Sequence, residues 1–191
     1  MKILFLFSAV LLSGCASSSP QPDWQLNAKS ALDSFQQRYL RGDTRAAQAE
    51  FDRARAELQS TGRGDLVARA ELVRCAVRAA SLEFDNCPGF ERLRADAGAE
   101  ELAYADFLSG KIERTGTDDL LSRLVSHGVK FNSGKATPEN IAAAVDIASA
   151  QGWRRPLLAW LGVQEKRAEA AGDREAQERI RRRIALVSGK S

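Results

Sequence analysis

Apolar residues recur at the spacing of an amphipathic helix through most of the chain, and short polar segments separate these stretches. No segment alternates apolar and polar residues in the way that a half-buried strand would. The sequence therefore predicts an all-α fold built of antiparallel helical hairpins. The expected helices cover residues 24–40, 44–60, 65–84, 90–97, 99–108, 119–128, 138–152, 154–171 and 174–187.

Glycine, aspartate and threonine mark several of the expected helix ends. Gly42 can adopt the left-handed conformation that closes a helix, and Asp43 or Thr44 can cap the helix that follows. Thr137 followed by Pro138 is a strong helix start, because threonine caps well and proline is tolerated at the first helical position.

The middle of the chain is less regular. Thr117-Asp118 is expected to cap a helix that ends near Gly128. Residues 130–135 are expected to form a loop. The last two helices are expected to pair antiparallel across the Gly172-Asp173 turn.

The N-terminal segment has a different character from the rest of the chain. Lys2 precedes a short apolar stretch, residues 3–12, which is too short for a bilayer-spanning helix of about 20 residues. It is typical of a signal-peptide core. The closing Leu12-Ser13-Gly14-Cys15 resembles the lipobox of bacterial lipoproteins. That resemblance implies cleavage before Cys15 and acylation of Cys15, with palmitate among the acyl chains; an ordinary secretory signal is the alternative.

The lipobox also sets the expected organisation and address of the chain. Residues 1–14 would be the lipoprotein signal peptide, residues 15–23 the lipidated cysteine with a flexible Ser/Pro tether, and residues 24–191 the helical domain. In the sorting rule of enteric lipoproteins, Asp after the lipidated Cys favours the inner membrane. Ala16 stands there instead, so the resemblance implies an outer-membrane anchor with the domain on the periplasmic face; an inner-membrane or surface-exposed location is the alternative.

Two cysteines remain in the body of the chain, Cys75 and Cys87. An even pair in an oxidising compartment predicts a disulfide, provided that the chain folds back between them. The alternative is two separate thiols, with Cys75 buried as a small apolar residue.

The helical hairpins resemble tetratricopeptide repeats at a limited set of positions. The pattern of small and aromatic residues in that repeat is matched by Ala47, Phe51 and Ala54 in one hairpin and by Trp160, Ala176 and Ile180 in the last. The resemblance implies a short helical solenoid. No fixed 34-residue period runs through the chain, and generic helical hairpins are the alternative.

Charge and residue usage give little support to catalysis, to metal binding or to nucleic-acid binding. The formal net charge is only +3, so there is no basic footprint for a nucleic acid. His127 is the single histidine, which makes a nucleophile–histidine pair or a zinc site improbable, and we expect neither a catalytic residue nor a cofactor. A single glutamate acting on glycans needs a cleft and a shifted pKa, and no glutamate stands out.

Two groups of side chains are candidates for contacts outside the chain. Trp153, Trp160 and Phe131 could anchor a partner, although packing at helix crossings is the alternative for each. The densest positive cluster could contact anionic headgroups or an acidic partner, or simply remain solvated at the end of its helix; it comprises Arg179, Arg181, Arg182 and Arg183.

These observations predict a lipid-anchored, non-catalytic scaffold or assembly factor that holds an envelope or secretion protein by helix-in-groove or extended-peptide capture. Binding or modification of envelope glycan (peptidoglycan) is the alternative, and a free-standing structural lipoprotein is a third possibility. An apolar groove would favour the scaffold, whereas a cleft around one buried glutamate would favour the glycan function.

Overall fold

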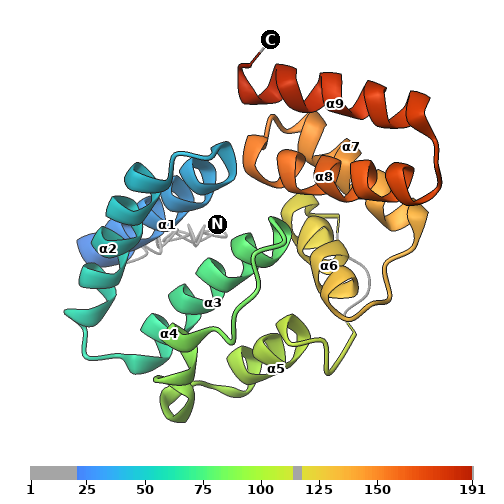
Figure 1. The fold of residues 1–191 in the computed structure, drawn as a ribbon. Coiled ribbons are helices and arrows are strands. Elements are labelled where there is room, and N and C mark those ends of the chain that lie inside the picture. The colour runs from blue at the N-terminus through green and yellow to red at the C-terminus, as the bar shows by residue number, and fades with distance from the viewer. Residues whose placement is uncertain (1–20, 114–117, 191) are drawn as a thin grey trace, which may run out of the picture.

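Helices make up the regular structure of this protein, for which a computed structural model describes residues 21–113 and 118–190 (Figure 1). No strand occurs within these two ranges, so the all-α class is confirmed for them. The lipobox, Cys15 and most of the tether lie outside the described residues. The elements are α1 (Asp23–Arg41), α2 (Thr44–Gln59), α3 (Gly64–Ala80), α4 (Pro88–Glu91), the short 3-10 helix η1 (Arg94–Asp96), α5 (Ala99–Leu108), α6 (Leu120–Asn132), α7 (Pro138–Ala150), α8 (Arg154–Ala170) and α9 (Arg174–Ser188).

The first hairpin, α1 with α2, follows the sequence prediction closely. Gly42 takes a φ of 91° after α1, and the Asp43 side chain accepts a hydrogen bond from the Ala46 amide at the start of α2. Helix α2 buries the predicted stripe of Ala47, Phe51, Ala54 and Leu58. The Phe51 ring meets Phe35 of α1 at 5.1 Å between ring centroids, so aromatic packing closes the hairpin.

Helix α3 is the central element, because it contacts α1, α2, α5 and α6. It ends at Ala80 and not near Phe84 as predicted. The Ser81 hydroxyl donates to the Val77 carbonyl, and Leu82 then takes a φ of 59°, a left-handed conformation that cannot continue the helix. Residues 82–87 form an extended loop instead.

Helix α6 corrects two predictions about the middle of the chain. It begins at Leu120, where the Asp119 side chain accepts from the Ser122 amide, and it runs to Asn132 without stopping at Gly128. Residues 130–132 are therefore helical, and only the segment after them is a turn. Gly128 lies where α6 crosses α3, and a Cβ there would stand 2.1 Å from the Ala79 carbonyl oxygen. The glycine thus permits a close helix crossing and does not end a helix.

The segment 90–97, predicted as one helix, is divided. Helix α4 ends at Glu91, and η1 follows after a turn at Leu93. Phe90 is fully buried beneath this segment, among residues of α3 and α5. The buried ring holds the segment close to α3, where a continuous helix was expected.

The C-terminal helices α7 and α8 share a large hydrophobic core with α3 and α6, and α9 packs on its edge. Thr137 and Asn140 make a reciprocal capping box at the start of α7, which confirms Thr137 as its cap. The α8–α9 pair occurs where it was predicted, and the Asp173 side chain caps α9. Helix α9 has no fully buried residue, and its Ile180, Ile184 and Val187 only partly cover the core beneath them.

The chain curves so that the N-terminal hairpin contacts helix α8 of the C-terminal group. In Figure 1 the α1–α2 hairpin and the α7–α9 group lie next to each other, and α5 lies on the opposite side of the molecule. Helix α8 contacts α1 across this junction, and Trp153 packs against both main hydrophobic clusters. Within the described ranges, no helix combines the length and the hydrophobicity that a membrane crossing requires.

Candidate partner-binding groove

A groove of about 630 Å³ lies between α1, α3, α5 and α6. Its apolar lining comes mainly from Leu72 and Val73 of α3, Tyr104 of α5, and Leu121 and Val125 of α6. Several of these side chains are only half-buried. Because burying apolar surface away from water is favourable, such a groove is suited to binding the apolar surface of another molecule.

The exposed residue Ile112 extends this apolar lining beyond the helices. It follows α5 in the chain, and 42% of its surface is exposed. A large aliphatic side chain at the edge of a groove offers a contact that the folded domain itself leaves incomplete.

Charged side chains also line the groove, and three of them, Arg69, Glu100 and Glu101, form what we call the charged rim. Arg69 donates to Glu101 over 2.7 Å and lies 3.6 Å from Glu100. Two carboxylates of α5 therefore meet one cation of α3, so the formal charge of this rim is negative. A positively charged partner segment would complement it.

The chemistry of Glu101 argues against a general acid in the groove. The hydrogen bond from Arg69 lowers the pKa of this buried carboxyl below its ordinary value, in spite of the opposing effect of burial. A general acid in a glycan-cleaving site needs a raised pKa. Glu101 instead stays ionised and fixes Arg69 at the rim.

The other buried glutamate, Glu71, has no part in the groove. Its side chain is 0% exposed, and its two carboxylate oxygens lie 2.5 Å from Arg74 and 3.7 Å from Arg55. Gly89 of α4 packs directly on it, since a Cβ at Gly89 would stand 2.1 Å from the carboxylate. Glu71 is thus sealed between helices and has no access to a substrate.

The three predicted aromatic anchors lie away from this groove, around α8. Trp160 is fully buried, and its indole N–H donates to the Ala80 carbonyl over 3.0 Å, so it packs at a helix crossing, which was the alternative to a partner contact. Phe131 is half-buried with its ring edge-on to Trp160, at 5.7 Å between centroids. Trp153 is half-buried at the α1–α8 junction. The structure brings these residues together as core packing and leaves any partner contact of Phe131 and Trp153 untested.

The four clustered arginines of α9, Arg179, Arg181, Arg182 and Arg183, are all exposed. Arg179 pairs with Glu175 of the same helix, and Arg181 pairs with Glu165 of α8 over 2.6 Å. Arg182 and Arg183 make no ion pair with a described residue. Of the four, only Arg181 therefore joins α9 to α8, and the contact of the cluster with a membrane or an acidic partner stays a prediction.

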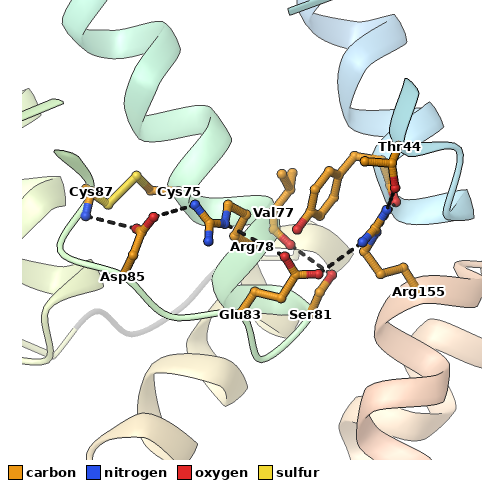
Figure 2. Close-up of polar contacts among 10 residues, drawn as sticks. Thr44, Cys75, Val77, Arg78, Ser81, Glu83, Asp85, Cys87 and Arg155 are labelled. Atoms are coloured by element: carbon orange, nitrogen blue, oxygen red, sulfur yellow. Dashed lines mark hydrogen bonds and ion pairs between the residues drawn. A yellow bond between two sulfur atoms is a disulfide. The ribbon is translucent and has the colours of Figure 1, made fainter. Parts of the chain in front are cut away.

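The sulfur atoms of Cys75 and Cys87 lie at disulfide distance, with their Cα atoms 5.8 Å apart, so the chain folds back as the prediction required (Figure 2). Asp85 is also near, and the three potential ligand atoms lie within 4.8 Å of one another. However, Asp85 accepts from the Cys87 amide over 3.0 Å and pairs with Arg78. Both carboxylate oxygens already have partners, so the disulfide and the ion pair explain the cluster without a metal.

His127 is half-buried in α6, and its Nδ1 has no hydrogen-bond partner among the described residues. Burial lowers the pKa of His127, and the nearby cations Lys130 and Arg123 act in the same direction. Its imidazole is thus held neutral in the folded protein.

The groove itself was missed by the sequence reasoning. Its walls come from four helices that are far apart in the chain, and no local motif reports such an assembly. One signal was available in α5, which carries apolar side chains on more than one side although it is short. A helix of that kind is either buried all round or incomplete without a partner.

No protein-family model matches the chain, and neither the curated proteins nor the solved structures include a significant match. The candidate site therefore depends on the geometry and chemistry of the groove alone.

Proposed function

We propose that this protein is a lipid-anchored, non-catalytic interaction protein of the bacterial envelope, which binds a segment of a partner protein in the groove between α1, α3, α5 and α6. In this proposal the helices form a short tetratricopeptide-like solenoid, and Cys15 carries the lipid that holds the domain at the outer membrane. The observation that carries the proposal is the half-exposed apolar lining of a groove of about 630 Å³.

The chemistry of the groove favours one kind of partner segment. Val73, Tyr104 and Leu121 offer an apolar floor that suits the apolar face of a helix or an extended peptide. The rim adds two carboxylates, Glu100 and Glu101, beside the single Arg69. The proposed occupant is therefore an amphipathic segment that carries lysine or arginine beside its apolar residues.

The proposed absence of catalysis has its own support. Glu101 is held ionised by Arg69, and Glu71 is sealed beneath Gly89. Neither buried glutamate is therefore placed as the general acid that glycoside cleavage needs, because Glu101 has a lowered pKa and Glu71 is out of reach of a substrate.

Site-specific photo-crosslinking in cells tests the proposal. A photoreactive amino acid is placed at Ala103, an exposed position of α5 that lines the groove, and at Ala56, an exposed position of α2 outside it. We expect one dominant envelope protein to be captured from position 103 and not from position 56. Equal capture from both positions would contradict the proposal.

A matched pair of substitutions then tests whether the groove is the binding site. Ala103→Arg adds bulk and positive charge to the groove, whereas Ala56→Arg makes the same change on an exposed face of α2. Only Ala103→Arg should abolish the crosslink or the co-purification of the captured protein. If Ala103→Arg instead abolished binding of purified peptidoglycan fragments, the glycan function would replace the scaffold.

A further inference from the structure

A continuous chain of polar contacts runs from the two cysteines to the junction between α8 and the α1–α2 hairpin (Figure 2). We call its four members, Asp85, Arg78, Glu83 and Arg155, the polar relay. Their charges alternate in sign along the chain. The polar relay connects segments that are remote in sequence, because Glu83 and Arg155 are 72 residues apart.

The first half of the polar relay fixes the loop after α3. Asp85 accepts from the Cys87 amide and pairs with Arg78 on α3, and Arg78 lies 3.8 Å from Glu83 on its other side. Both loop carboxylates therefore converge on one guanidinium. Cys87 is the point at which the loop is tied back to α3 through Cys75.

The second half of the polar relay joins the loop to the start of α8. Glu83 lies 3.1 Å from Arg155, which also donates to the Thr44 hydroxyl over 2.5 Å and to the Tyr39 carbonyl over 2.9 Å. The Arg155 guanidinium stands 4.3 Å from the centre of the Tyr39 ring. One side chain of α8 thus contacts the end of α1, the start of α2 and the loop.

Two backbone features show that this loop depends on its attachments. Leu82 and Cys87 both have positive φ values, 59° and 45°, which are unfavourable for residues other than glycine. They stand on either side of Glu83 and Asp85. Without the covalent link to Cys75, the left-handed conformation of Cys87 loses the constraint that holds it.

We infer that the Cys75–Cys87 pair is a redox-sensitive lock on the α1–α8 junction, acting through the polar relay. In the oxidised protein the disulfide holds the loop so that Glu83 meets Arg155. In the reduced protein the loop is released at Cys87, and Arg155 loses its fixed carboxylate partner. The helix junction then keeps the remaining contacts of Arg155 and the packing around Trp153.

In this inference the Cys75–Cys87 disulfide is reduced by thiol–disulfide exchange with a dithiol. A thiolate of the dithiol attacks the Cys87 sulfur, because Cys87 is half-exposed at a cavity of about 470 Å³ whereas Cys75 is only 7% exposed. The S–S bond breaks and Cys75 leaves as a thiolate. The second thiol of the dithiol then displaces Cys87, so that two electrons and two protons pass to the pair and the dithiol becomes a disulfide.

An unfolding experiment on the purified full chain tests whether the disulfide and the Glu83–Arg155 contact stabilise the protein cooperatively. The urea unfolding midpoint is measured for the wild type and Glu83→Gln, each oxidised and each reduced with dithiothreitol. We expect Glu83→Gln to lower the midpoint of the oxidised protein more than that of the reduced protein. Glu165→Gln, which removes the partner of Arg181 between α8 and α9, is the matched control and should lower both midpoints equally.

Amide hydrogen exchange on the reduced wild type gives an independent measurement, since it needs no substitution. Reduction should increase exchange in the first turns of α8 and α2, around Arg155 and Thr44, while the α8–α9 contact near Glu165 keeps its protection. Equal effects of Glu83→Gln in the two redox states, or loss of protection confined to residues 80–91, would overturn the inference. Any effect on partner binding through α1 rests on the proposed function, whereas this coupling is measured on the free protein.

Discussion

Gly128 and Gly162 are both interior helical glycines, but their surroundings are opposite. At Gly128 a Cβ would stand 2.1 Å from the Ala79 carbonyl oxygen, whereas nothing lies within 4 Å of a Cβ at Gly162. We expect Gly128→Ala to push α6 away from α3 and to cost about 1–3 kcal/mol of unfolding free energy. Gly162→Ala should instead stabilise the protein by up to about 1 kcal/mol, because alanine favours the helix.

Urea unfolding of the two glycine variants separates these effects. The slope of the unfolding free energy against urea should stay constant, so that the midpoints report stability. If Gly128→Ala were as stable as Gly162→Ala, the close crossing of α3 and α6 would not exist in solution.

His127 provides a pH-dependent prediction at the same scale. Its pKa is lowered in the folded state, so the unfolded chain takes up a proton more readily as the pH falls. The stability from neutral His127 is fully present above about pH 6.5 and is lost as the pH falls below that value. Glutamine cannot titrate, so His127→Gln should lack this loss.

The measurement compares the unfolding free energies of wild type and His127→Gln at pH 7.5 and pH 5.5. Carboxylates such as Glu101, whose pKa is also lowered, contribute equally to both proteins and cancel in the difference. Moving from the higher to the lower pH should decrease the stability of the wild type relative to the variant. A constant difference, or a change of the opposite sign, would show that His127 is not held neutral by burial.

At the scale of elements, the contact of α3 with α2 and α4 centres on the buried carboxylate of Glu71. Arg74 and Arg55 provide its counter-charges. Glu71→Gln keeps the shape but removes the anion between Arg74 and Arg55, which are themselves partly exposed, so we expect a cost of about 1–3 kcal/mol. The control is Asp33→Asn, which breaks the exposed Lys29–Asp33 pair and should cost about 0–1 kcal/mol.

Thermal unfolding followed by circular dichroism measures both changes. A large loss of stability for Glu71→Gln beside a small one for Asp33→Asn would establish the buried pair as structural. Similar small losses for both would mean that Glu71 is hydrated in solution and not sealed by Gly89.

Elements were predictable from the sequence where one helix face alone decides the structure. The stripe from Ala47 to Leu58 defined α2, and Thr137 defined the start of α7, because both signals are local. Gly128 was misjudged because its role depends on the Ala79 carbonyl of another helix. The sequence pattern could not distinguish a glycine that ends a helix from one that allows another helix to pack closely against it.

The candidate site was less predictable than the helices for the same reason. Trp160 was a reasonable candidate as an anchor, but its burial depends on the packing of α3, α6 and α8 around it. The groove arises only when Val73, Tyr104 and Leu121 are brought together from three helices. Aromatic residues in the sequence therefore identified core packing, whereas the exposed apolar surface lay elsewhere.

At the scale of the whole molecule, the proposed role depends on where the domain is held. The proposed anchor is the lipid on Cys15, which the resemblance of residues 12–15 to a lipobox implies. Several acyl chains give stable attachment where one chain gives only marginal binding. A short tether of residues 15–23 would keep the groove close to the membrane surface.

Cys15→Ala removes the acylation site and leaves every described helix unchanged. We expect the variant to incorporate no labelled palmitate and to remain uncleaved after Gly14, because the lipobox requires its cysteine. Cys87→Ser is the matched control, since it also removes one thiol but lies in the body of the domain, and it should incorporate palmitate as the wild type does. Labelling of Cys15→Ala, or loss of labelling in Cys87→Ser, would contradict lipid anchoring at Cys15 and with it the proposed position of the groove at the membrane.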